Sequence, residues 1–177
     1  MNLESFVSQS EGSWRSMRSG HSLAFRQFEE VLSHIKIKRL SLDDPQVTDL
    51  IETADELNVK PSSPFYMEWS AESDWEPDDP SLVSQGSCVL VPFPTNTEEG
   101  LLLRSVGYAE AEQAIGKYCF LSDGTFALTT RYGQSIAEER IWFVSEHVRC
   151  RSSVLRTSEG SGVLQTSFSS EVRRLSL

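Results

Sequence analysis

The sequence predicts a mainly β protein, an antiparallel β-barrel of about eight to ten strands with one main α-helix. Three observations support this fold class. The chain has a Gly-x-Trp strand entry near its start, one helical period after a proline, and strand signals separated by turn residues from there to its end. Closing so many strands into a barrel removes the exposed sheet edges. At 177 residues the chain is expected to form a single domain, 1–177.

The first two strands are predicted at Glu11–His21 and at Ser33–Ser41. In the first strand Trp14, Ser16 and Arg18 share one face, because successive side chains of a strand point to opposite sides. Residues 33–41 alternate in a way that is typical of a half-buried strand. This opening is typical of a calycin barrel, the lipocalin and fatty-acid-binding-protein class, whose interior can hold a small ligand.

The main helix is predicted over about residues 44–57, where Asp43 and Asp44 can cap the N-terminus and Pro45 suits the first turn. After Pro61 we expect strands and turns. The clearest expected strands are Ser87–Pro92, Lys117–Leu121, Phe126–Arg131, Ala137–Val144 and His147–Arg156. The acidic segment Glu72–Asp79 around Trp75 is expected to form a loop over a barrel mouth.

Charge and cysteine usage exclude several classes of function. Asp plus Glu number 26 against 16 Lys plus Arg, and a net charge of −10 argues against binding to nucleic acid or to an anionic membrane. No segment approaches the roughly 20 apolar residues of a spanning helix, so a soluble, cytoplasmic protein is expected. The cysteines lack Cys-x-x-Cys spacing, which favours buried free thiols over a disulfide framework or a metal site. They are Cys88, Cys119 and Cys150.

Arg149, Arg151 and Ser153 occupy alternate positions of one predicted strand and share a face. If this face points inward, the guanidinium groups are suited to bind carboxylates, and Arg18 is a third candidate for the same anion. If it points outward, the arginines form a solvated stripe on the barrel exterior, since Arg is seldom fully buried unless paired.

Glu139 shares a face with Ile141 and Phe143. A carboxylate on an apolar inner face needs a donor, either an arginine of a neighbouring strand or the N–H groups of a ligand. In that orientation Arg140 and Trp142 lie on the outer face. An exposed Trp there is typical of a contact surface, so a homodimer is expected.

Met67, Trp69 and Trp75 could form a flat wall for a ligand, or they could simply fill the core. His21 could donate a proton or contact a ligand, or it could be hydrogen-bonded at a strand end. The sequence contains no Gly-x-Ser-x-Gly, His-Glu-x-x-His or Gly-rich phosphate loop. The residues alone therefore indicate a barrel that binds a flat, dicarboxylic molecule.

Several motifs together resemble those of the S/U-type phycobiliprotein lyases, the bilin-attaching proteins of cyanobacteria and of red-algal and cryptophyte plastids. The resemblance runs from about residue 6 to residue 155 and leaves the tail from Arg156 outside. The motifs are Ser10-x-Gly12-x-Trp14-x-Ser16-x-Arg18-x-x-His21-x-Leu23-Ala24-Phe25, Asp43-Asp44-Pro45, Gly100-Leu101-Leu102-Leu103-Arg104 with Gly107-Tyr108-Ala109-Glu110, Glu139-Arg140-x-Trp142-Phe143, and Arg149-x-Arg151-x-Ser153.

The resemblance implies a protein that binds an open-chain bilin, with phycocyanobilin expected, and delivers it to a cysteine of an apo-phycobiliprotein subunit of the phycocyanin or allophycocyanin type. No tightly bound cofactor or metal is implied, because the bilin is the transferred substrate. The thiolate of the acceptor subunit would add to the ethylidene carbon of bilin ring A. A passive bilin or fatty-acid carrier and a pure assembly factor are the other classes that the sequence leaves open.

The resemblance also implies roles for the residues already singled out. Arginines would hold the propionates, Glu139 would face the pyrrole nitrogens, and the aromatic wall would pack on the rings. The expected catalytic residues are Glu139, Arg149 and Arg18, and the expected ligand-binding residues are Trp14, Ser16, His21, Met67, Trp69, Trp75, Arg151 and Ser153.

Overall fold

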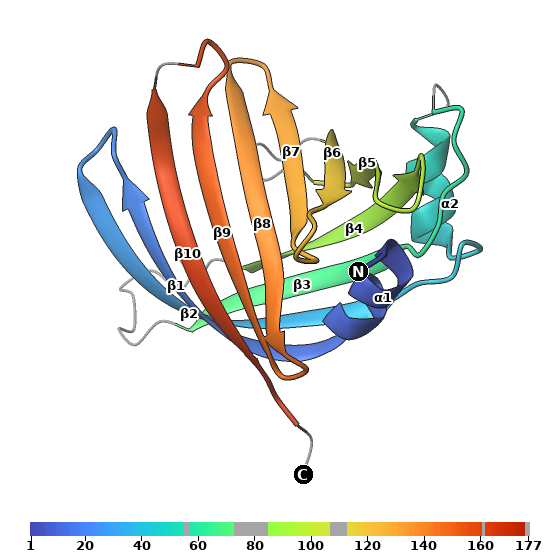
Figure 1. The fold of residues 1–177 in the computed structure, drawn as a ribbon, viewed down its shortest axis with the longest axis horizontal. Helices are drawn as coiled ribbons and strands as arrows, with labels where there is room; N and C mark the ends of the chain where they lie inside the picture. Colours follow the sequence, from blue (N-terminus) through green and yellow to red (C-terminus); the bar gives the residue numbers. More distant parts are fainter. Residues whose placement is uncertain (55–56, 73–84, 107–112, 161, 176–177) are drawn as a thin grey trace.

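In the computed structural model the chain forms a closed barrel of antiparallel strands (Figure 1). The structure describes residues 1–54, 57–72, 85–106, 113–160 and 162–175. Within these ranges the strands are β1 Gly12–Ser22, β2 Gln27–Arg39, β3 Phe65–Glu72, β4 Gln85–Pro94, β5 Glu99–Arg104, β6 Ala114–Phe120, β7 Phe126–Tyr132, β8 Ser135–Ser145, β9 Val148–Thr157 and β10 Val163–Arg173. Each strand pairs with the next in sequence, and β1 pairs with β10 to close the barrel.

The expected strands agree with the structure within a few residues, except for the second. β2 begins at Gln27 rather than at Ser33, and its added residues pair with β1 as far as Ser22↔Gln27. The polar residues Gln27, Glu29 and Glu30 conceal this part of the strand in the sequence, because they are exposed and show no alternation of apolar and polar side chains.

Among the described residues the structure contains two short helices where one longer helix was expected. α2, Pro45–Glu52, begins as predicted: the Asp44 side chain accepts a hydrogen bond from the Gln46 backbone N–H (2.9 Å). The other helix, α1 at Leu3–Ser10, was missed. It is only eight residues long, although Asn2 caps it and its buried residues recur at helical spacing.

The two helices lie on different sides of the barrel wall. α1 buries Phe6 inside one end of the barrel, where its ring stacks on Phe126 with centroids 4.4 Å apart. α2 packs Val47 and Leu50 on the outer face of β4 and β5, which explains why β4 is buried on both faces. No helix in the described ranges is long and apolar enough to cross a membrane. The barrel interior is therefore closed by α1 and not by the helix that the sequence predicted.

The tail beyond Arg156 is part of the barrel. β10 pairs along its length with β9 on one side and with β1 on the other, through register pairs such as Trp14↔Arg173 and Arg18↔Ser169. The cysteines are free, as expected, although only Cys88 is fully buried while Cys119 and Cys150 are partly exposed.

Candidate functional site

The barrel interior contains a cavity of about 360 Å³. A second small space of about 40 Å³ continues beside α1 at the closed end. The lining comes from inward-facing alternate residues of strands on both sides of the barrel. Its polar and aromatic members are Ser16, Arg18, Ser33, Trp69, Arg104, Arg151, Gln165, Ser167, Ser169 and Glu171.

Trp14, Ser16 and Arg18 share one face of β1, as predicted, and the structure shows that this face points inward, but the three residues do different things. Ser16 and Arg18 line the cavity. Trp14 is completely buried at the closed end, where its Nε1 donates a hydrogen bond to the Ser10 carbonyl oxygen (2.9 Å). The guanidinium groups of Arg149 and Arg173 lie 4.6 and 4.2 Å from its ring centroid. Trp14 therefore braces the closed end of the barrel.

Arg149 also belongs to this closed end. It is 2% exposed and forms an ion pair with Glu171, with 2.5 Å between Nε and Oε2. Burial lowers the pKa of Arg149, and the nearby charge of Glu171 opposes that shift. Glu171 lies directly opposite Arg149 in the register of β9 and β10. The solvated-stripe alternative is therefore wrong for this residue.

Arg151 lies two residues further along β9 and lines the cavity. Its side chain is half-buried, and its Nε is buried with no hydrogen-bond partner among the described residues. Ser153, the third residue of this face, is buried and shares a hydrogen bond of 2.6 Å with Ser167. Arg151 is thus available to a ligand.

Glu139 points inward and pairs with Arg104 of β5, with 3.1 Å between Oε2 and Nη1. Both side chains are buried. Burial acts to lower the pKa of Arg104, but the charge of Glu139, with smaller contributions from Cys88 and Tyr132, raises it overall. Of the two partners expected for Glu139, the structure therefore supplies an arginine.

Arg104 and Glu171 were not recognised as site residues in the sequence. Arg104 lies in a quoted motif, but its apolar neighbours suggest only a core strand. Glu171 lies in the tail, where Gln165, Ser167 and Ser169 precede it at alternate positions. Residues 165–171 are polar at every position except Phe168, so no alternation marked this inward face in the sequence, and only the pairing of β10 with β1 and β9 places the four side chains inside.

The interior charges balance except at one residue. Arg18 pairs with Glu29 at 2.8 Å near the open end, Arg104 pairs with Glu139, and Arg149 pairs with Glu171. Arg151 alone among these inward arginines has no acidic partner in the part of the chain that the structure describes. Buried polar atoms without a hydrogen-bond partner also surround the cavity: Arg104 Nε, Arg149 Nη2, Arg151 Nε and Glu171 Oε1. The site is therefore suited to an anion that also offers N–H donors.

The aromatic wall is present in part. Met67 and Trp69 line the cavity, and Trp69 lies against Gly86, where an added Cβ would come within 2.5 Å of the indole ring. Trp75 lies outside the described residues. His21 is exposed on the outer face, with its ring centroid 4.9 Å from that of Phe28. The expectation that His21 contacts a ligand in the barrel is wrong, because β1 continues without a bulge and gives it the opposite orientation to Arg18.

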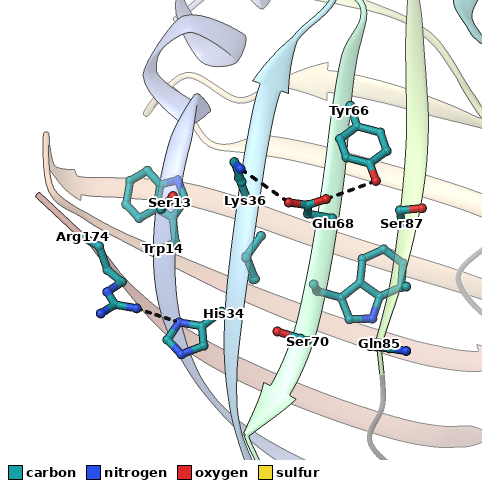
Figure 2. A pocket seen from close by; sticks show the side chains of 13 residues that line it. Ser13, Trp14, His34, Lys36, Tyr66, Glu68, Ser70, Gln85, Ser87 and Arg174 are labelled. Atoms are coloured by element: carbon teal, nitrogen blue, oxygen red, sulfur yellow. Dashed lines mark hydrogen bonds and ion pairs between the residues drawn. The ribbon is translucent and has the colours of Figure 1, made fainter. Parts of the chain in front are cut away.

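A larger hollow of about 670 Å³ lies on the outer face of β2 and β3 (Figure 2). Figure 2 shows its charged side chains paired with neighbours: Lys36 with Glu68 (3.8 Å), Tyr66 with Glu68 (3.2 Å) and Arg174 with His34 (3.4 Å). This outer groove lacks the buried polar atoms without partners that mark the interior. The interior cavity is therefore the candidate site.

Comparisons with known proteins agree with this geometry. The family described as CpeS-like protein matches residues 2–174, which includes β10. A protein of Trichodesmium erythraeum named chromophore lyase CpcS/CpeS 3 is 48% identical over 98% of this chain and 99% of its own length. A putative phycoerythrobilin lyase CpeS of Microchaete diplosiphon is 45% identical over 89% of this chain and 71% of its own length.

The fold has a match among solved structures. The S-type phycobiliprotein lyase CpeS of Guillardia theta is 40% identical, with a TM-score of 0.83, over 100% of this chain and 95% of that one. Calycin-like architecture, interior arginines and sequence similarity along almost the whole chain lead to the same assignment. This chain belongs to the CpeS-like family, whose relatives are named chromophore lyases.

Proposed function

We propose that this protein binds an open-chain bilin inside the barrel and attaches it, through a thioether bond, to a cysteine of an apo-phycobiliprotein subunit. The observation that carries the proposal is Arg151, a cavity-lining guanidinium without an acidic partner among the described residues. A bilin carries two propionates and several pyrrole N–H groups. It would supply the anion and the donors that the cavity lacks.

The roles of the site residues follow from their surroundings. Arg151 would bind one propionate directly, and Arg18, a third exposed and paired with Glu29, could exchange this partner for the other propionate. Trp69 and Met67 would pack on the pyrrole rings. Arg149, held by Glu171 and Trp14, would position the closed end and contact the bilin only through its free Nη2.

Glu139 would act on the electronic state of the bilin. A carboxylate facing the pyrrole nitrogens favours the protonated, more electrophilic tetrapyrrole. In the reaction the acceptor thiolate forms a C–S bond to the ethylidene carbon of ring A, and the electron pair of the double bond takes up a proton on the ring. No group leaves and no oxidant is needed. The residues of this chain supply orientation and charge, and the nucleophile belongs to the acceptor.

The cysteines of this chain need no part in the chemistry. Cys88 is buried, and Cys88, Cys119 and Cys150 are absent from the lining of the interior cavity. Cys119 and Cys150 alternate with the inward-facing Tyr118 and Arg149, whereas Cys88 belongs to the interior core beside Arg104.

Which bilin is bound and which type of subunit accepts it also belong to the proposal. The resemblance implied phycocyanobilin and an acceptor of the phycocyanin or allophycocyanin type, whereas the relative at 45% identity is named a putative phycoerythrobilin lyase. A cytoplasmic homodimer is also proposed. It is supported by Trp142 on the outer face, whose ring centroid lies 6.1 Å from that of Phe168 on β10.

The test is co-expression with a pathway that makes phycocyanobilin or phycoerythrobilin, together with each candidate acceptor subunit. We expect one pair to give acceptor colour that survives denaturation. A coloured complex of this protein with no covalent colour on any acceptor would identify a passive carrier. Absence of any coloured complex would favour an assembly factor that binds the acceptor alone.

A further inference from the structure

The hairpin of β1 and β2 extends past the neighbouring strand at one end of the barrel (Figure 1). These two strands pair as far as Ser22↔Gln27, whereas the pairing of β2 with β3 in the described residues reaches only Leu32↔Glu72. The turn at residues 23–26 connects them, with Arg26 at a φ of 54°. Among the described residues, no strand therefore pairs with the tip of the hairpin on the β3 side.

The tip carries large apolar side chains that the core does not use. Leu23 is 51%, Phe25 76% and Phe28 57% exposed. Phe25 is more exposed than any other large apolar side chain that the structure describes. Turns are ordinarily built from Gly, Pro, Asn, Asp and Ser, so Leu-Ala-Phe-Arg at this position calls for a reason other than turn geometry. Leu23 and Phe25 end the motif that begins at Ser10, and neither of them lines the interior cavity.

The hairpin tip lies at the open end of the ligand cavity. Gln165 lines both the cavity and the adjoining space beside Gly20 and Ser22. The Leu23 backbone N–H donates a hydrogen bond to the Leu164 carbonyl oxygen (2.9 Å), which holds the turn against β10. The other end is filled by α1, whose Phe6 packs in the core. A molecule that leaves the cavity toward Gly20 passes the hairpin tip.

We propose that Leu23, Phe25 and Phe28 form the surface on which the acceptor subunit docks, through an apolar patch beside its acceptor cysteine. The inference rests on the proposed function, because an acceptor thiolate can reach a bilin only where the cavity opens. Apolar contact also binds without relying on charge, which suits a protein with a net charge of −10. A second copy of this chain or a lipid surface would be competing occupants, and the test separates them.

The experiment compares Phe25→Ser with the control Leu121→Ser, which removes an exposed leucine (39%) from the turn between β6 and β7. The affinity of each bilin-loaded protein for apo-subunit is measured directly by titration, independently of attachment. We expect Phe25→Ser to weaken acceptor binding about tenfold, as loss of a central apolar contact does. The bilin absorption spectrum and the attachment rate at saturating acceptor should stay unchanged, and Phe25→Leu should restore most of the affinity.

Several results would overturn the docking surface. One is equal acceptor affinity for Phe25→Ser and wild type, and another is loss of bilin binding in Phe25→Ser, which would make the tip part of the cavity. A third is loss of phosphatidylcholine-vesicle binding or of self-association in Phe25→Ser while acceptor affinity is retained. A wild type that binds acceptor through the hairpin tip but attaches no bilin would instead contradict the proposed function alone.

Discussion

Arg149 and Glu171 form a fully buried ion pair that connects β9 to β10 inside the barrel. Their side chains are 2% and 1% exposed, and the Arg149 guanidinium also lies 4.6 Å from the Trp14 ring centroid on β1. Three strands that meet where the barrel closes are thus joined by one charged pair and one aromatic ring. The pair is a structural brace at the end of the cavity.

Replacing Glu171 by Ala should destabilise the protein severely. The change leaves the Arg149 charge buried without a partner, which costs about 3–5 kcal/mol in the free energy of unfolding. Urea denaturation followed by circular dichroism measures the loss. The control is Glu138→Ala, which breaks the exposed Glu138–Arg156 pair of 2.9 Å and should cost less than about 1 kcal/mol. Equal costs for the two variants would contradict the buried brace.

Arg151→Ala should weaken bilin binding while the fold stays stable. Loss of a hydrogen bond between charged groups costs about 1.5–3 kcal/mol, roughly 10- to 150-fold in affinity. Attachment should fall in parallel. Absorption titration with free bilin measures the affinity, and Arg131→Ala, on the outer face of β7, is the control. Arg149→Ala should lose binding and stability together, because it leaves Glu171 unpaired. Wild-type binding in Arg151→Ala would remove the main support for the proposed site.

Glu139→Gln should separate bilin binding from activation. The amide keeps the shape of the side chain but not the negative charge that favours a protonated tetrapyrrole. We expect bilin still to bind, with a weakened or blue-shifted long-wavelength band, and attachment to slow on the order of 100-fold. Arg104→Gln breaks the same 3.1 Å pair while keeping the carboxylate. If both variants transfer equally slowly and show the same spectrum, Glu139 acts only through the ion pair.

Tyr118 should make stability depend on pH in the alkaline range. Its hydroxyl oxygen is buried without a hydrogen-bond partner among the described residues, and burial raises the pKa of Tyr118 to about 12. Tyr118 of the unfolded chain ionises first, near an ordinary pKa of about 10. The stability that Tyr118 contributes to the folded state is therefore complete below a pH of about 10 and is lost as the pH rises toward 12.

The comparison of wild type with Tyr118→Phe isolates this contribution. Between pH of about 9 and 11.5 the wild type should lose up to about 2 kcal/mol more stability than the variant in urea denaturation. The absorbance of tyrosinate should show one group that ionises late and only in the wild type. Identical pH profiles for the two proteins would mean that this hydroxyl is hydrated.

Trp142→Asp should convert the proposed homodimer to a monomer. Trp142 and Phe168 contact each other on the outer face of the barrel, and a charge there cannot be buried in an apolar interface without a partner. Light scattering over a wide concentration range measures the mass. Val144 is exposed on the same strand, and Val144→Ser is a milder variant that should weaken the dimer less than Trp142→Asp does. A wild-type monomer at every concentration would end the dimer proposal.

The alternation of side chains along single strands could be determined from the sequence, because direction in a strand depends only on parity. It correctly grouped Trp14 with Ser16 and Arg18, and Arg149 with Arg151 and Ser153. Their inward direction stayed open, because parity defines two faces without deciding which is inside. The same parity excludes His21 from the cavity, although it was expected to contact a ligand.

Tertiary structure alone decided which charges meet. Arg104 and Glu139 are 35 residues apart, and Arg149 and Glu171 are 22 apart. Their pairing depends on strand order and register around the closed barrel, which no local pattern encodes. For the same reason α1, a helix of only eight residues, was recognised as the plug of the barrel only once its Phe6 was seen against Phe126. In the closed barrel Arg151 has no acidic partner among the described residues, and the proposed function depends on this residue.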